Sequence, residues 1–450
     1  FLSVSGTTAL SGDVTTSTAG GGTGSQTYTG NVSLNAASTL TGSTVLFGAD
    51  NTVDKVDGNG RNLVLNFSGP TVLAGGFGQR AGNKIASLTL GNGGSTTLLG
   101  NVETTGPQSY SDSLVLGAAS TLDSGSGSLS LAAVDGGGFD MTLTSTGAKA
   151  LSGAISGVAN WVITGGGTGT TITGGSIVST GAQTYGETVT LGGNTTLTGT
   201  NPAFAATAVT GAGYDLTLNF SGTTVVNSTF SGIRNLATGN GGGTTISGGT
   251  FTTTGTQVYG DSVTLGGAVT LVGTDLTLAG VTGAGFGLTL SGTGTTALTG
   301  TVSGVGVLTS GNGGATEIGA TIGSTGSQTF SEPVTLTADT ALNAGSADIS
   351  FSETITGGGN ALNIITSGNG HFMKSATGMS TLTTSAGGKT IFGSSGGSAV
   401  SITTSGSQVY SDQVDTWVHA TLTGSSISLN GGIANPRAGG NGSTSITTNP

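Results

Sequence analysis

Short segments in which apolar residues alternate with threonine recur along the chain, for example Val189-Thr-Leu191, Val263-Thr-Leu265 and Val334-Thr-Leu336. Successive side chains of a β-strand point to opposite faces. The alternation therefore predicts strands whose valine and leucine side chains enter a core while their threonine side chains face water. No stretch carries apolar residues at the spacing of three or four that indicates an amphipathic helix. The pattern predicts an all-β protein.

A longer repeat is superimposed on this alternation. The segment Thr180–Leu191 has five variant copies elsewhere, and in each a glutamine is followed two positions later by an aromatic residue. The six pairs are Gln26 and Tyr28, Gln108 and Tyr110, Gln183 and Tyr185, Gln257 and Tyr259, Gln328 and Phe330, and Gln408 and Tyr410. Successive glutamines are 82, 75, 74, 71 and 80 residues apart. Such a period is the signature of a repeat architecture.

Two further markers follow each glutamine–aromatic pair in a constant order. The first has the form of Val209-Thr-Gly-Ala-Gly213, and the second is a glycine cluster such as Gly239–Gly243 before a threonine-rich strand. A sandwich needs different strands at its edges and centre, whereas repeated segments favour a stack of coils that cover one another. We therefore predict one parallel β-helix (β-solenoid) over residues 1–450. Its repeats are 1–22 (partial), 23–104, 105–179, 180–253, 254–324, 325–404 and 405–450 (partial).

The length of a repeat exceeds that of one coil. If a coil holds roughly 19 to 25 residues, each repeat makes three or four coils and the chain makes about 18 to 24. Glycine is expected at the corners, where positive φ or close backbone approach is required. Both ends of the sequence fall part-way through a repeat, so we expect the chain to be a piece of a longer protein.

Composition narrows the classes of function. The chain has 90 glycines and 6% charged residues, against about 25% charged residues in ordinary domains. The 34% of apolar residues argue against disorder. A net charge of −11 lacks the basic footprint of a nucleic-acid binder. The absence of cysteine excludes disulfides and thiolate metal sites, and the absence of an apolar run of about 18 residues predicts no membrane span.

Runs such as Ser179–Gly199 resemble the repeats of filamentous-haemagglutinin-like bacterial exoproteins and related autotransporter passengers. The resemblance covers essentially the whole chain. It implies a right-handed parallel β-helix that is exported to the outer surface of a Gram-negative cell or beyond. It also implies an adhesive or surface-structural role, as in extracellular fibres and biofilms.

Catalysis is one candidate chemistry, because parallel β-helices also host polysaccharide lyases and hydrolases. Such enzymes need clustered carboxylates or basic groups. Here His371 lies near Lys374, and His419 lies near Asp412 and Asp415, but neither grouping recurs. We interpret these residues as exposed or terminal polar groups and predict that the protein is not an enzyme. We predict no catalytic residue and no cofactor.

Two arrangements of acidic residues suggest metal binding. Gly136-Gly-Gly-Phe-Asp140 and Gly211-Ala-Gly-Tyr-Asp215 echo the calcium-binding nonapeptide of β-rolls, but an apolar residue directly follows each aspartate, so we predict no metal site. An acidic residue also follows most motif aromatics by two positions. We interpret this series as a solvated corner, with repulsion between molecules or weak cation binding as the functional alternative. Its members are Asp112, Glu187, Asp261, Glu332 and Asp412.

The glutamine–aromatic pair has a structural and a functional interpretation. We favour the structural one, in which the aromatic ring is an internal wedge and the glutamine satisfies buried backbone groups at a corner. The alternative is an outward series of tyrosines that stack on sugars. Threonine pairs such as Thr142-Leu-Thr144 suggest the flat arrays of ice-binding solenoids, but interruptions by serine, asparagine and glycine leave no single regular face in the sequence.

The sequence therefore favours a non-enzymatic, exported, adhesive or structural β-solenoid. The expected partners are host or matrix glycans and proteins, without nucleic acid. The solenoid ends would expose unpaired strand edges, and this predicts end-to-end self-association into fibres. The alternative hypothesis is a carbohydrate-active β-helix enzyme or a glycan-binding module, which a cleft lined by several carboxylates would support.

Overall fold

The computed structural model describes residues 1–21, 23–48, 55–73, 76–79, 82–204, 209–226, 230–385, 387–435 and 443–448. The chain divides into two compact units. Unit 1 comprises Phe1–Thr224 and Ser231–Ile233, and unit 2 comprises Val225–Phe230 and Arg234–Pro450. The described residues form strands β1 to β63 and one short 3-10 helix, η1 (Ala19–Gly21), and no α-helix occurs among them. The prediction of an all-β protein is confirmed.

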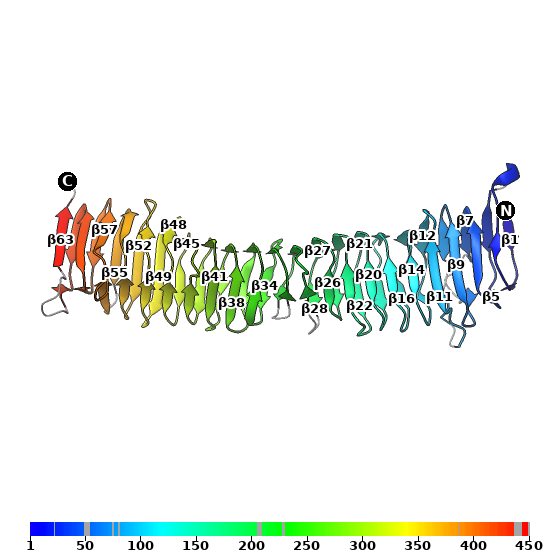
Figure 1. The fold of residues 1–450 in the computed structure, drawn as a ribbon, viewed down its shortest axis with the longest axis horizontal. Helices are drawn as coiled ribbons and strands as arrows, with labels where there is room; N and C mark the ends of the chain where they lie inside the picture. Colours follow the sequence, from blue (N-terminus) through cyan, green and yellow to red (C-terminus); the bar gives the residue numbers. More distant parts are fainter. Residues whose placement is uncertain are drawn as a thin grey trace. The chain divides into compact units, whose positions relative to one another are not determined.

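Unit 1 is a parallel β-solenoid with three strands in each turn (Figure 1). A strand generally pairs in parallel with the strand three places further along the chain, as β1 does with β4 and β14 does with β17. Between β8 and β13 the place of one strand is taken by Phe77, which forms isolated parallel bridges to Val56 and Val102. Three stacks of parallel strands result, here called the first, second and third sheets of the unit.

The first sheet of unit 1 contains β1 (Leu2–Val4), β4 (Ser25–Tyr28), β7 (Thr44–Phe47), β10 (Thr71–Leu73), β12 (Ser95–Leu98), β15 (Ser113–Leu116), β18 (Val134–Asp135), β21 (Ile155–Val158), β24 (Ser176–Ser179), β27 (Thr195–Gly199) and β30 (Leu216–Phe220). The second contains β2 (Thr8–Leu10), β5 (Val32–Leu34), β8 (Val56–Asp57), β13 (Val102–Glu103), β16 (Ser120–Asp123), β19 (Met141–Thr144), β22 (Trp161–Thr164), β25 (Gln183–Tyr185) and β28 (Pro202–Phe204). The third contains β3 (Val14–Thr15), β6 (Ser38–Gly42), β9 (Asn62–Phe67), β11 (Ser87–Gly91), β14 (Gln108–Tyr110), β17 (Leu129–Leu131), β20 (Lys149–Leu151), β23 (Thr170–Ile172), β26 (Val189–Leu191) and β29 (Val209–Thr210).

Unit 2 has the same construction. Its first sheet contains β33 (Leu236–Gly239), β36 (Gln257–Tyr259), β39 (Leu276–Leu278), β42 (Thr295–Leu298), β45 (Ala315–Ile318), β48 (Val334–Leu336), β51 (Ile355–Thr356), β54 (Ala376–Met379), β57 (Val400–Thr404), β60 (His419–Gly424) and β63 (Ser443–Thr448). The second contains β34 (Gly243–Ile246), β37 (Ser262–Leu265), β40 (Val281–Thr282), β43 (Val302–Val305), β46 (Ile322–Ser324), β49 (Thr340–Gly345), β52 (Leu362–Thr366), β55 (Leu382–Ser385), β58 (Ser407–Tyr410) and β61 (Ser426–Leu429). The third contains β35 (Gly249–Thr252), β38 (Val269–Gly273), β41 (Leu288–Gly292), β44 (Leu308–Ser310), β47 (Gln328–Phe330), β50 (Ile349–Phe351), β53 (Gly370–Phe372), β56 (Lys389–Phe392), β59 (Gln413–Thr416) and β62 (Ile433–Ala434). Two short strands, β31 (Thr224–Val226) and β32 (Phe230–Ser231), carry residues of both units.

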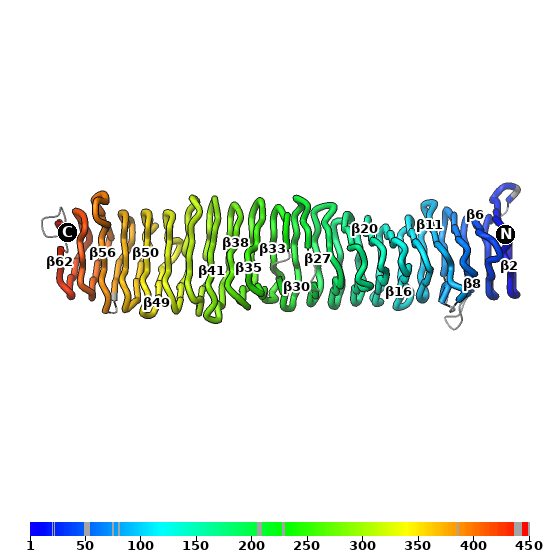
Figure 2. The backbone as a smooth tube through the Cα atoms, turned by 60° about the horizontal axis from the view of Figure 1, so that its bottom comes forward, coloured from blue at the N-terminus to red at the C-terminus, as the bar shows by residue number. Residues whose placement is uncertain are grey.

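The length of a turn varies although its strands stay in register. In unit 1 the step from one turn to the next is 18 residues between Thr96 and Leu114 but 26 residues between Val45 and Thr71. The strands stay in register across these different turn lengths, and Figure 2 shows the backbone winding turn after turn within each unit. The chain makes about 21 turns, within the predicted range. Handedness stays a prediction.

The core of each unit consists of inward side chains stacked from turn to turn. Val189 and Leu191 are buried while Thr190 between them is half-exposed, so the predicted alternation is confirmed. In unit 2 four phenylalanines at matching positions of β47, β50, β53 and β56 stack on one another with centroids 5.2 to 5.7 Å apart. Burial of one such side chain stabilises a fold by roughly 1.5–3 kcal/mol. Stability is therefore distributed along each stack rather than concentrated in one centre.

Candidate functional site

The glutamine–aromatic pair is a buried hydrogen-bonded clamp between successive turns. Gln183 Nε2 donates to Ile177 O at 3.1 Å in β24 and to Thr198 O at 2.8 Å in β27, one turn later. The Tyr185 hydroxyl donates to Gln183 Oε1 at 2.7 Å, and both side chains are fully buried. Because buried backbone carbonyls need partners, this clamp closes a corner where the ladder of the sheet is interrupted.

The same contacts recur in the other copies. Each later glutamine donates to carbonyl oxygens six residues before it and fifteen residues after it, as Gln108 does to Val102 O and Asp123 O. The predicted structural role of the pair is therefore confirmed. The alternative, an outward series of sugar-stacking tyrosines, is wrong for these tyrosines, since all five are buried.

The repeat of the sequence does not contain a whole number of turns. The glutamines of the last five copies lie on β14, β25, β36, β47 and β58, eleven strands apart. With three strands in a turn, one repeat makes three and two-thirds turns. The motif therefore lies in a different sheet in each successive copy. In unit 1 it lies in the first, third and second sheets, on β4, β14 and β25.

One copy of the clamp is incomplete. Phe330 stands where the other copies have tyrosine, and the Gln328 Oε1 atom is buried without a hydrogen-bond partner. The Phe330 ring stacks on Phe351 at 5.2 Å and 13°, the same geometry that Tyr28 adopts on Phe47. A tyrosine hydroxyl therefore fits in this position.

We expect Phe330→Tyr to stabilise the turns around β47 by about 1 kcal/mol, because the new hydroxyl satisfies a buried acceptor. Native-state hydrogen exchange of the β47 and β50 amides should show slower local opening. The reverse change in a complete copy, Tyr259→Phe, should speed opening around β36 by a similar factor. Unchanged protection in both variants would contradict the clamp.

The same tyrosines make the fold sensitive to alkali. Burial raises the pKa of Tyr28 from 10.0 to about 12 and raises the pKa values of Tyr110, Tyr185, Tyr259 and Tyr410 as well. The folded state thus keeps its phenolic protons at a pH where an unfolded chain loses them. The contribution of these protonated tyrosines to the free energy of unfolding is fully present below pH 10, and it is lost as the pH rises through the folded-state pKa.

We therefore expect the turns around β4 to lose stability between about pH 10 and pH 12. Circular dichroism and tyrosinate absorbance recorded together should change in parallel for the buried tyrosines. In the Tyr28→Phe variant, the turns around β4 should no longer lose stability in this pH range, although the variant is less stable than the parent at neutral pH. Ionisation of all tyrosines at their ordinary value, without unfolding, would refute the expectation.

The acidic series was predicted to be a solvated corner, and this prediction is wrong. All five side chains are at most 7% exposed and accept hydrogen bonds from backbone N–H groups of the preceding turn. Gly93 N donates to Asp112 at 3.0 Å, and Asn312 N and Gly314 N both donate to Glu332 at 3.1 Å. Gly167, Gly241 and Gly387 donate in the same way to Glu187, Asp261 and Asp412.

These contacts join two of the sequence markers. The glycine cluster turns through positive φ, as at Gly93 and Gly241, and its N–H groups point away from the ladder. A carboxylate accepts such N–H groups strongly. The acidic residue of one turn therefore fixes the glycine corner of the turn before it.

The histidines and their neighbours do not form a common site. His371 Nε2 lies 3.5 Å from Asp348 Oδ2, while Lys374 is exposed. His419 is exposed, in accord with the prediction, and contacts Ser443. The interpretation as exposed residues is wrong for Asp412 and for Asp415, whose buried carboxylate binds Lys389 at 2.7 Å.

The calcium-like segments have another role. Asp140 Oδ1 accepts hydrogen bonds from the backbone N–H and the side-chain amide of Asn160 on the next turn, at 3.0 and 2.9 Å. Within the described ranges, no three His, Asp or Glu side chains gather closely enough to hold a metal ion. The aromatic residues before these aspartates, Phe139 and Tyr214, are 39% and 38% exposed at tight turns. The sequence does not mark them as exposed, because they lie outside the glutamine–aromatic series.

Threonine side chains form a regular outer row on one sheet of unit 2, and this row is not evident from the sequence. On the third sheet of unit 2, Thr250, Thr270, Thr289, Thr309 and Thr329 are direct register partners on consecutive turns, and Ser350 continues the row. Their side chains lie on the solvent side, spaced by about 4.8 Å. The prediction that no regular face exists is therefore wrong for this sheet.

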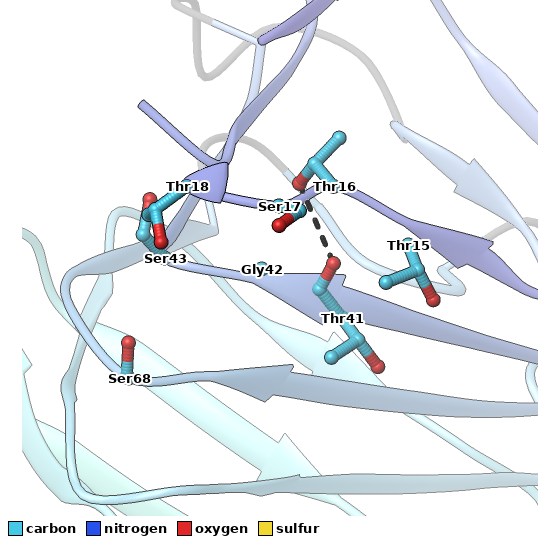
Figure 3. Close-up of a pocket in the computed structure, with 8 residues that line it drawn as sticks. All are labelled: Thr15, Thr16, Ser17, Thr18, Thr41, Gly42, Ser43 and Ser68. Carbon is cyan, nitrogen blue, oxygen red and sulfur yellow. Dashed lines mark hydrogen bonds between the residues drawn. The ribbon is translucent and has the colours of Figure 1, made fainter. Parts of the chain in front are cut away.

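Unit 1 carries an open notch lined by hydroxyl groups beyond the end of β3 (Figure 3). Its volume is about 280 Å³, and Thr15–Thr18, Thr41–Ser43 and Ser68 line it from three successive turns. Part of its hydroxyls are engaged, since Thr16 Oγ1 donates to Gly24 O at 2.6 Å. No carboxylate lines the notch, so its chemistry suits contact with a neutral polar ligand rather than proton transfer.

Comparison of this chain with protein-family models, with curated proteins and with solved structures finds no match. The resemblance to bacterial exoproteins is therefore supported at the level of fold alone, as a long all-β parallel solenoid. No helix in the described part of the chain is long and apolar enough to cross a membrane.

Proposed function

We propose that this protein is an exported, non-enzymatic β-solenoid that serves as an adhesive and structural element at a bacterial surface or in an extracellular matrix. The observation that carries the proposal is the in-register threonine row of unit 2. A neutral row repeated on six consecutive turns offers the same weak contact many times, and multivalency turns such contacts into firm attachment.

The disposition of the charged and amide groups supports the same proposal. Six glutamines and five of the 20 acidic residues are committed to the frame: the glutamines bridge turns, and the carboxylates hold glycine corners. The hydroxyl row, in contrast, is a repeated feature of the surface. Attachment, rather than bond cleavage, is the activity that such a division of roles favours.

The test uses beads that carry the whole chain, flowed over surfaces coated with neutral polysaccharide, extracellular-matrix protein or albumin. Attachment above the albumin background is expected on one of the first two surfaces. The triple variant T270A/T289A/T309A should release under much weaker flow than the parent, because the loss of adjacent contacts compounds. The matched control T171A/T190A/T210A alters three paired threonines of unit 1 and should release no more easily than the parent.

Two results would overturn the proposal. One is attachment no stronger than that of albumin-coated beads on every surface. The other is the appearance of new reducing ends when soluble polysaccharides are incubated with the protein, which would favour the carbohydrate-active alternative. Circular dichroism of both triple variants separates loss of attachment from loss of fold.

A further inference from the structure

An apolar cavity of about 330 Å³ lies on the outer side of the third sheet of unit 2. Three successive turns build it, at the ends of β53, β56 and β59. Its lining consists of His371, Met373, Ile391, Gly393, Ser394, Ser395 and Trp417. This volume is at the lower end of the range for small-ligand sites.

A missing side chain creates the cavity. Met373, Gly393 and Trp417 occupy equivalent rungs, because their N–H groups donate to Phe351 O, Phe372 O and Phe392 O, each one turn earlier. Gly393 leaves the middle rung empty, so Met373 and Trp417 stand two strand spacings apart, about 9.6 Å. Gly393 also has a φ of 70°, and a Cβ there would overlap Val418. Local backbone geometry therefore maintains the gap.

Of the residues that line the cavity, only His371 is ionisable. His371 lies against Asp348, and Lys389 is paired with Asp415. The walls are the Trp417 indole and the aliphatic Met373 and Ile391, and Ser394 and Ser395 add exposed hydroxyls. A ligand for this cavity therefore needs one flat apolar face, an edge that forms hydrogen bonds, and no charge.

We propose that this cavity binds one neutral hexopyranose ring of a glycan. The C–H face of the ring packs on the Trp417 indole, and its hydroxyls meet water and Ser394 and Ser395. A purely aliphatic protein side chain would make no use of those serine hydroxyls, and an anionic sugar would find no cationic side chain other than His371 among the lining residues. The inference rests on the proposed adhesive function, to which it adds a ligand class and a defined subsite.

The chain supplies its own spectroscopic probe. Trp161, the second tryptophan, is fully buried, and its Nε1 atom has no hydrogen-bond partner, so Trp161→Phe removes no such bond. In W161F the emission of Trp417 should change saturably with methyl glycosides of neutral hexoses, at a Kd of about 1–10 mM. Sorbitol, which has hydroxyls but no ring, and methyl hexuronides should have little effect.

Saturation-transfer NMR extends the test to variants without this probe. Trp417→Ala should weaken binding by about tenfold to hundredfold, the range found when a stacking aromatic is removed. Met373→Ala should weaken it less. Tyr214→Ala removes a more exposed aromatic side chain elsewhere and should leave binding unchanged.

Three outcomes would decide against the site, and two more would separate the site from the proposed function. A non-saturable response to every neutral glycoside would overturn it, and so would equal responses to sorbitol. Saturable binding of N-acetyl-leucinamide in place of the sugars would reassign the cavity to an aliphatic protein side chain. Bead attachment that survives Trp417→Ala would remove the cavity from adhesion while leaving the proposed function intact. Hexose binding by a protein whose beads do not attach would support the cavity as a sugar site and overturn the proposed adhesive function.

Discussion

Replacing Gln183 with leucine is expected to destabilise the turns around β25 by about 3–5 kcal/mol. The substitution leaves Ile177 O and Thr198 O without their side-chain donor, and it leaves the buried Tyr185 hydroxyl without an acceptor. Each buried group that loses its partner costs about 1–3 kcal/mol. Leucine fills a similar volume, so the loss should come from hydrogen bonding rather than from a cavity.

The measurement is hydrogen exchange of the β24, β25 and β27 amides, because a long stack of turns opens locally and a single unfolding free energy is poorly defined for it. A double-mutant cycle with Tyr185→Phe provides the control. In the Q183L background that second change removes an already unpaired hydroxyl, so it should cost less than it does alone. Additive effects would mean that the tyrosine and glutamine act independently, contrary to the clamp.

The fold was predictable because the alternation of apolar and hydroxyl residues is a property of each strand by itself. The burial of Val189 and Leu191 follows from their neighbours in sequence. The role of Gln183 was predictable for a related reason: a glutamine at a fixed position in every repeat lies at a corner, where buried carbonyls are within reach in whichever sheet it falls.

The prediction for the acidic series was wrong because the hydrogen-bond partners of these carboxylates lie one turn earlier in the chain. Asp112 is held by Gly93 and Asp412 by Gly387, at separations of 19 and 25 residues. Turn lengths vary over a similar range, so the sequence does not show which glycine corner each carboxylate will meet. The threonine row was hidden for the same reason, since its members become neighbours only through the register of whole turns.

Because a repeat does not contain a whole number of turns, the buried clamp and the outer rows of side chains follow different periods along the chain. The glutamine bridges turns in every copy, but it lies in a different sheet each time, so an outer row on one sheet is assembled from different parts of the repeat. The row from Thr250 to Thr329 runs from before the clamp of Gln257 to the clamp of Gln328. A surface feature can therefore change in one place without altering the motif that keeps the turns in register.

In the buried ion pair of Lys149 and Glu187, the two side chains differ in how many other hydrogen-bond partners they have. Lys149 Nζ and Glu187 Oε2 are 2.8 Å apart, and the two side chains are 0% and 2% exposed. Glu187 also accepts from Gly167 N and Thr170 Oγ1, whereas Lys149 has one other partner, Ser145 O. In unit 2 the matching carboxylate, Glu332, is held by backbone N–H groups and Thr316, and Thr296 occupies the place of lysine.

This comparison predicts that the two halves of the pair are not equivalent. Glu187→Gln leaves a buried ammonium group without a counter-charge, and we expect it to destabilise the turns around β20, β23 and β26 by about 3–5 kcal/mol. Lys149→Thr reproduces the arrangement around Glu332, and we expect it to cost clearly less. The double variant E187Q/K149T should recover part of the loss caused by E187Q alone, because it removes the unpaired charge. Hydrogen exchange of the three strands measures all three variants, and equal losses for the two single changes would show that the carboxylate depends on the lysine after all.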